Sequence, residues 1–206
     1  MMKRAISKNF FHWEPIIGPW VFDQRLINKY LAENKPPKES ALDYRDIETK
    51  ILVYEDRVKG WFLDVANELK KNNEAGFIIL QISLSYIEGS QQYREGKSSR
   101  NVSEKFFIRG MSRIFKRRGK NYKRLLKDFY KQVRCGLFHD GMTRRNVTIS
   151  GEFKKDLLFT ENEIKINPHK FLDTIYEDFE NYIKQLKNKR NVRLRKNFED
   201  HMNLIG

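Results

Sequence analysis

The sequence predicts a mainly helical bundle that carries a small β-hairpin before its last helix. Apolar residues recur at steps of three and four through several long stretches, which is the spacing of amphipathic helices. Residues 76–93 are apolar on most sides over their first turns, as is typical of a central buried helix. Between residues 147 and 166 the apolar residues alternate instead, which predicts two short strands. At 206 residues and 39% hydrophobic content, the chain can bury one core.

The predicted elements follow one another with short breaks. A short helix is expected at 22–32, before Pro36 and Pro37 interrupt the chain. Long helices are expected at 40–73, 76–93, 102–115, 122–138 and 168–189, and the hairpin strands at 147–150 and 157–166. These elements predict three regions, namely an N-terminal aromatic arm with a short helix at 1–38, a helical domain at 39–190 and a basic C-terminal tail at 191–206.

The chain carries a large excess of positive charge. Its 41 Lys and Arg residues exceed its 27 Asp and Glu residues, so the formal net charge of +14 attracts polyanions. No apolar run reaches the length of a membrane-spanning helix, roughly 18 residues. A single cysteine, Cys135, excludes an internal disulfide. We therefore expect a cytoplasmic protein that binds nucleic acid, RNA rather than DNA, and does not contact membranes.

Positive charge is concentrated between Arg109 and Arg134. Eleven Lys and Arg residues occur there against a single acidic residue, Asp128. On the helix expected at 122–138, lysines recur every four residues opposite the apolar side, and we call Lys123, Lys127 and Lys131 the cationic stripe. Such a stripe fits backbone phosphates. The residues expected to bind RNA are Lys123, Lys127, Lys131, Arg117 and Arg118.

An Arg and a His separated by four residues follow this stripe. Arg134 and His139 lie in the stretch FYKQVRCGLFHDGMT, at the end of the predicted helix. An Arg-x4-His pair in this place, in a small basic helical protein, resembles the signature of the HEPN superfamily. The stretch is similar to a branch of that superfamily found among plasmid and mobile-element proteins. By the order of its elements, the resemblance extends over residues 51–186.

The resemblance implies a metal-independent endoribonuclease whose cleft lies between the two protomers of a homodimer, with roles in toxin–antitoxin systems or in defence against phages and plasmids. His139 would exchange the proton of a ribose 2′-OH, and Arg134 would stabilise the charge on the phosphorane. Glu88, at the polar end of the core helix, is similar to the acidic helper of some members. Tyr93 and Asn146 are weaker candidates. An antitoxin partner and the absence of any cofactor are further expectations.

Two features of this stretch complicate the expected chemistry. Side chains five residues apart on a straight α-helix point about 140° away from each other. Arg134 and His139 therefore converge only if the helix frays or tightens at Gly136, or if the working pair comes from opposite subunits. Cys135 also stands where active family members often carry a polar residue. His139 has, in addition, a purely structural interpretation, since a cation is favourable at the C-terminal end of a helix.

Two alternative functions remain open from the sequence. A non-catalytic RNA-binding or interaction module would keep the bundle and the cationic stripe without cleavage. A metal-dependent nuclease of the PD-(D/E)xK type is suggested by Asp156 followed by Glu163 and Lys165, since alternation puts Glu163 and Lys165 on one strand face. The four histidines are widely spaced and lack cysteine companions, so no zinc site is expected.

Overall fold

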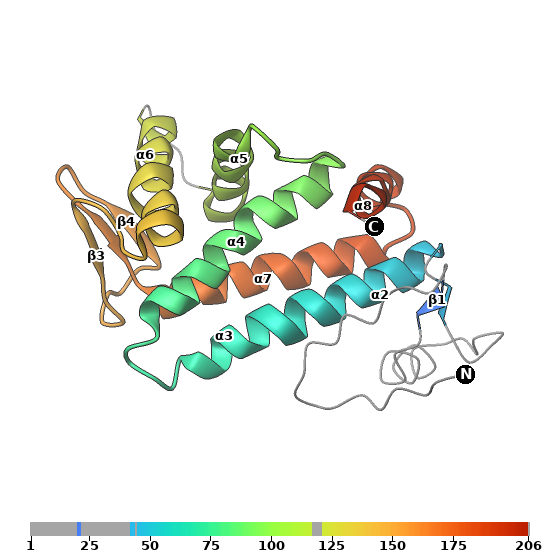
Figure 1. Cartoon of the computed structure of the whole chain (residues 1–206), viewed down its shortest axis with the longest axis horizontal. Helices are drawn as coiled ribbons and strands as arrows, with labels where there is room; N and C mark the ends of the chain where they lie inside the picture. Colours follow the sequence, from blue (N-terminus) through green and yellow to red (C-terminus); the bar gives the residue numbers. More distant parts are fainter. Residues whose placement is uncertain (1–19, 22–41, 44, 117–120, 206) are drawn as a thin grey trace. The chain divides into compact units, whose positions relative to one another are not determined.

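The computed structural model describes residues 20–21, 42–43, 45–116 and 121–205, which form a mainly helical protein with a small three-stranded sheet (Figure 1). The chain divides into two units, Met1–Asp56 and Arg57–Gly206. This division falls later than the predicted boundary after residue 38. The helix predicted at 22–32 and the expected RNA-binding residues Arg117 and Arg118 lie outside the described residues.

In the first unit, the described residues form a short strand pair and a helix. β1 (Trp20–Val21) pairs antiparallel with β2 (Leu42–Asp43). α2 (Ile47–Arg57) follows, and the Asp46 carboxylate accepts a hydrogen bond from the Thr49 amide at 3.3 Å before its first turn. The strand pair was not predicted, because strands of two residues are too short to leave an alternating pattern.

The second unit contains the helical bundle and the sheet. None of the helices in the described part of the chain has the length and apolar content that a bilayer crossing requires. The elements are η1 (Val58–Leu63, a π-helix), α3 (Asp64–Leu69), α4 (Gly76–Glu95), α5 (Ser103–Phe115), α6 (Tyr122–Phe129), the π-helices η2 (Tyr130–Arg134) and η3 (Gly136–Asp140), β3 (Val147–Ile149), β4 (Leu157–Phe159), β5 (Ile164–Ile166), α7 (Pro168–Lys187) and α8 (Val192–Ile205).

The central element of this unit is α4, as the sequence predicted. It packs against α5, α7 and α8, and Figure 1 shows it running beside α7 through the bundle. Its residues Ile79, Leu84 and Ile87 are fully buried. The crossing with α5 is close, because a Cβ atom built on Gly110 would lie 2.7 Å from the Ile87 carbonyl oxygen. A side chain at position 110 would therefore force the two helices apart.

A cluster of aromatic rings fixes α6 to the rest of the bundle. The Phe129 ring of α6 stacks on Phe107 of α5 at 6.1 Å and on Phe171 of α7 at 6.2 Å between centroids. All three rings are fully buried. Aromatic side chains bury a large apolar area, so this cluster supplies much of the free energy that holds α6 in place. It thereby sets the position of the helix that carries the cationic stripe and Arg134.

The sheet differs from the predicted two-stranded hairpin. Its strand order is β3-β5-β4, with β5 antiparallel to β4 and parallel to β3. The stretch 157–166, predicted as one strand, contains a tight turn in which the Thr160 hydroxyl accepts a hydrogen bond from the Glu163 amide at 3.0 Å. Apolar residues occur on both sides of this turn, so the alternation alone could not reveal it.

The segment predicted as a basic tail at 191–206 is largely the helix α8. Phe198 and Met202 are buried, and the helix packs against α4. Two polar side chains bind carbonyls near the ends of other helices: Arg195 donates to Leu186 at 2.6 Å, and Asn197 donates to Arg94 at 2.7 Å. The prediction was wrong because charge dominates this stretch, while its buried apolar residues are few and spaced three to four apart.

The buried histidine of α8 makes the stability of this unit depend on pH. His201 is 4% exposed, its ring lies 4.4 Å from that of Tyr93, and its Nδ1 has no hydrogen-bond partner among the described residues. Burial lowers the pKa of His201 below its ordinary value of 6.5. Since the unfolded chain takes up the proton more readily, the free energy of unfolding falls as pH drops below about 6.5.

We therefore expect urea denaturation to give a lower stability at pH 5.5 than at pH 7.5, with a contribution from this residue of at most about 1.4 kcal/mol per pH unit. His201→Leu should flatten that slope even if it changes the stability itself. A variant with the same pH slope as the natural chain would show that another group is responsible.

Candidate functional site

The helix that carries the predicted Arg-x4-His pair is not a straight α-helix. α6 passes into η2 at Tyr130, and η3 extends from Gly136 to Asp140. A π-helix joins each residue to the fifth one along rather than the fourth, so its turns are wider. Because the segment that joins Arg134 to His139 is mostly π-helical, the two side chains point less far apart than they would on a straight α-helix. The sequence suggested fraying or tightening at Gly136, whereas the structure widens the turn.

The loop after the helix depends on a glycine at position 136. A Cβ atom built there would lie 2.5 Å from the Met142 carbonyl oxygen. The returning chain is fixed against η2, because the Arg144 amide donates to the Gln132 carbonyl at 2.8 Å. Gly141 ends the helix in the left-handed region, with φ 69°. The glycines at 136 and 141 thus let the chain turn back closely beside the candidate pair.

The Arg134 side chain is fixed by Glu88 of α4. Its Nη2 donates to Glu88 Oε2 at 3.1 Å, and Glu88 Oε1 accepts from the Ser99 hydroxyl at 2.7 Å. The guanidinium carbon lies 4.4 Å from the centre of the Phe138 ring. The side chains of Arg134 and Glu88 are 18% and 12% exposed, so the pair is largely shielded from water. The other guanidinium N–H groups have no hydrogen-bond partner among the described residues, which leaves them available to a ligand.

The His139 side chain is open to solvent. It is exposed, and its imidazole has no hydrogen bond or ion pair with another described residue. The neighbouring Asp140 binds Arg144 at 2.7 Å instead. That hydrogen bond, helped by the charges of Arg144 and His139, lowers the pKa of the Asp140 carboxyl. The imidazole is therefore accessible to a ligand at this surface.

Cys135, which follows Arg134 directly, is half-buried and not part of a disulfide. Its partner is Tyr130, whose pKa is raised by burial and also by a hydrogen bond to this thiol. The Tyr130 ring lies 5.5 Å from the Arg134 guanidinium carbon. Cys135 therefore contacts Tyr130, whose ring lies beside the Arg134 guanidinium.

The cationic stripe lies on the solvent side of α6 and η2. Lys123, Lys127 and Lys131 are exposed, and none makes an ion pair with another described residue. Residues four apart on an α-helix are separated by about 6 Å along its axis. The opposite side of the helix carries the buried Leu126 and Phe129. The stripe is thus a row of unpaired charges that leads toward Arg134.

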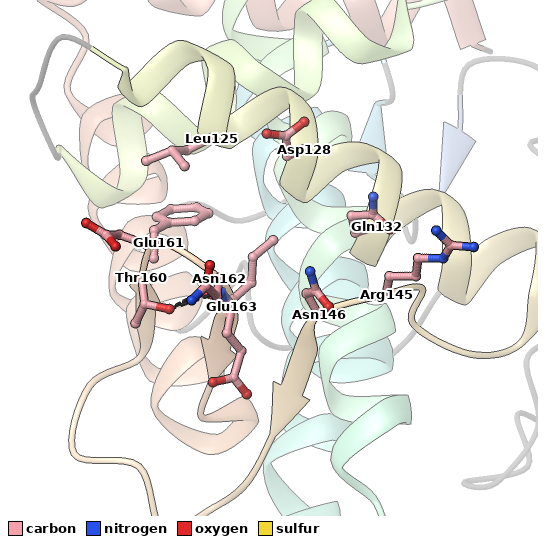
Figure 2. Close-up of a pocket in the computed structure, with 11 residues that line it drawn as sticks. Leu125, Asp128, Gln132, Arg145, Asn146, Thr160, Glu161, Asn162 and Glu163 are labelled. Carbon is pink, nitrogen blue, oxygen red and sulfur yellow. Dashed lines mark hydrogen bonds between the residues drawn. The ribbon is translucent and has the colours of Figure 1, made fainter.

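A pocket of about 260 Å³ lies between this helix and the sheet (Figure 2). Three segments line it: the helix supplies Leu125, Asp128 and Gln132, the loop before β3 supplies Arg145 and Asn146, and the β4–β5 turn supplies residues 159–164. The sequence could not reveal this pocket, because its lining comes from segments far apart in the chain. Asn146, a weaker catalytic candidate from the sequence, lines this pocket.

The residues of the metal-dependent alternative do not converge. Asp156 precedes β4 and binds the Thr174 hydroxyl at 3.2 Å, while Glu163, just before β5, pairs at 3.3 Å with Lys165 of that strand. In the β4–β5 register, Leu157 faces Ile166, so Asp156 and Glu163 lie at opposite ends of the hairpin. No group of three or more His, Cys, Asp or Glu residues that could hold a metal ion occurs within the described ranges.

Tyr93, the other weaker candidate, packs against α8. Its ring stacks on Phe198 at 5.6 Å and meets the edge of His201 at 4.4 Å.

Comparisons of the chain with protein-family models, with curated proteins and with solved structures found no match. The assignment of a function therefore rests on the geometry and chemistry of Glu88, Arg134 and His139.

The Glu88–Arg134 contact can be measured by a double-mutant cycle. Removing either partner leaves the other charge shielded and unpaired, so Glu88→Ala and Arg134→Ala should each destabilise the fold. Urea denaturation of the two single variants and the double variant should give a coupling energy of about 1–3 kcal/mol. The exposed Asp140–Arg144 pair is the control and should give a much smaller coupling. Equal coupling energies for the two ion pairs would contradict the greater burial of the Glu88–Arg134 pair.

Proposed function

We propose that this chain is a HEPN-type endoribonuclease that cleaves RNA without a metal ion. The observation that carries the proposal is that a guanidinium fixed by an ion pair and a solvent-exposed imidazole occur five residues apart on one helix. Arg134 is held by Glu88 yet keeps unused N–H groups, and the exposed His139 lies one widened turn further along the helix. Attack of a ribose 2′-OH on the adjacent phosphorus needs these two groups, a proton carrier near neutral pH and a fixed cation.

The roles of the three residues follow from their surroundings. His139 takes the proton of the attacking 2′-OH or delivers a proton to the leaving 5′ oxygen, and the product is a 2′,3′-cyclic phosphate. Arg134 binds phosphate oxygens through the N–H groups that Glu88 does not use. Glu88 is a positioning residue, because it is shielded and contacts the guanidinium rather than the substrate.

A homodimer completes this proposal. The reaction moves two protons, one from the attacking hydroxyl and one to the leaving oxygen, and a second protomer supplies a second imidazole. Phe138 and Met142, on either side of His139 in the chain, are 39% and 65% exposed and offer an apolar contact beside it. The chain has a single cysteine, Cys135, and a protein that needs no internal disulfide is compatible with action in the cytoplasm.

A non-catalytic RNA-binding module is the second candidate. The ion pair between Arg134 and Glu88 favours it, because a guanidinium neutralised by a shielded carboxylate has less charge to offer a phosphorane. Cys135, in place of the polar residue common in active members, favours it as well. Both candidates share the cationic stripe as the surface that binds RNA.

The cleavage assay separates the two candidates. Purified protein incubated with structured RNA should cut it equally well with and without EDTA and leave cyclic phosphate ends. His139→Ala and Arg134→Ala should each lower the rate at least about 100-fold. His169→Ala and Arg193→Ala, which change the same residue types elsewhere in the bundle, should cut at the natural rate. Binding without cleavage in any buffer would favour the second candidate, and loss of cleavage in EDTA would favour a metal-dependent nuclease.

The cationic stripe predicts how binding depends on salt. Each phosphate contact to a single strand contributes about 0.7 to the slope of log affinity against log salt concentration. Replacing Lys123, Lys127 and Lys131 by Gln should therefore reduce that slope by about 2, as measured by fluorescence anisotropy with a labelled RNA. Three lysines of the opposite end of the unit, Lys184, Lys187 and Lys189, are a charge-matched control. An equal reduction in the control would show that net charge, rather than the stripe, attracts RNA.

A further inference from the structure

We infer that the pocket between the helix and the β4–β5 turn receives one unpaired base of the RNA and prefers guanine. This inference rests on the proposed function, because it assigns a sequence preference to the same RNA substrate. The volume of about 260 Å³ accommodates a base. Leu125, the half-buried Phe159 and the buried Ile164 provide apolar walls, and polar side chains complete the lining. An apolar pocket with a few convergent polar groups is the usual form of a small-molecule or base site.

Several of the polar side chains that line the pocket keep free hydrogen-bonding groups. Asp128, Gln132, Asn146 and Asn162 have no side-chain hydrogen bond to another described residue. Each amide offers both a donor and an acceptor, which is what the edge of a base requires. Unpaired bases are commonly read in this way on their Watson–Crick edges. The pocket thus combines stacking surface with free hydrogen-bonding groups.

The charge of the pocket argues for a base rather than a phosphate. Two free carboxylates, Asp128 and Glu161, line it against the single cation Arg145, although the whole chain carries +14. The Glu163 carboxylate does not contribute, because it binds Thr148 and Lys165 and points away from the helix in Figure 2. A carboxylate accepts hydrogen bonds only. Among the bases, guanine presents two adjacent N–H donors on one edge, so Asp128 selects guanine.

Along the chain, the pocket residue Gln132 lies next to the cationic stripe and close to the proposed cleavage site. Gln132 lies on the same π-helical turn as Arg134, and Lys131 precedes it in the chain. Asn146 holds the opposite rim in the left-handed region with φ 58°, a conformation that asparagine tolerates, and its carbonyl accepts from the Ile164 amide at 2.8 Å. In this proposal the strand runs along the stripe and turns one base into the pocket.

The experiment measures base preference and pocket occupancy separately. Single-stranded 2′-O-methyl RNAs, which cannot be cleaved by 2′-OH attack, carry one G, A, C or U within an otherwise uniform sequence. The G-containing strand should bind about tenfold more tightly than the A-containing one. Asp128→Asn should remove that preference, while Glu152→Gln, an equal change of charge on an exposed loop, should keep it.

Guanosine monophosphate should shift the NMR signals of the Gln132, Asn146 and Asn162 side-chain amides.

The outcomes distinguish failure of the pocket assignment from failure of the proposed function. Tight, salt-sensitive RNA binding without base preference, and without amide shifts on adding guanosine monophosphate, would overturn the pocket assignment and leave the proposed function standing. Failure of every RNA to bind would overturn the proposed function, while the nucleotide titration would still decide the pocket. Stronger Asp128-dependent shifts with an arginine-containing peptide than with the nucleotide would overturn the base assignment in favour of a protein partner.

Discussion

The ion pair between Glu88 and Arg134 is the interaction on which the candidate site depends. A guanidinium that is 18% exposed needs a partner, since an unpaired charge so far shielded from water would destabilise the fold. Glu88 is itself fixed by Ser99 at 2.7 Å, so the guanidinium is held by a chain of contacts that begins on the central helix α4. In the proposed reaction, a cation preorganised in this way would need no rearrangement to bind a phosphate, which is what electrostatic stabilisation of a transition state requires.

The widened turns of the helix place the second group of the site. η2 and η3 reduce the angle between the Arg134 and His139 side chains relative to a straight α-helix, and Gly136 makes room for the returning loop. π-helical turns are rare and are frequently found at functional sites. The stacked rings of Phe107, Phe129 and Phe171 anchor the preceding helix, so the cationic stripe, the pocket and the candidate pair share one rigid support.

The sequence predicted the long helices of the bundle because their apolar periodicity is strong and their breaks contain Gly, Pro or Asn. It placed Glu88 at a polar helix end, yet only the packing of α4 against the Arg134 helix could show that the two charges meet. The π-helical turns were beyond prediction, because the buried residues Phe129, Val133 and Leu137 fit an α-helix equally well. The pocket was missed because its lining joins segments far apart in the chain, and α8 was missed because charged residues outnumber its few buried apolar ones.

The most direct test of this account is a crystal structure of the protein bound to a short RNA that carries a 2′-deoxy nucleotide at the cut site. The account predicts one phosphate within hydrogen-bond distance, about 3 Å, of both the Arg134 guanidinium and the His139 imidazole, with Glu88 still paired to Arg134. A phosphate bound elsewhere, with Arg134 contacting only Glu88 and His139 remote from the RNA in every protomer, would contradict it.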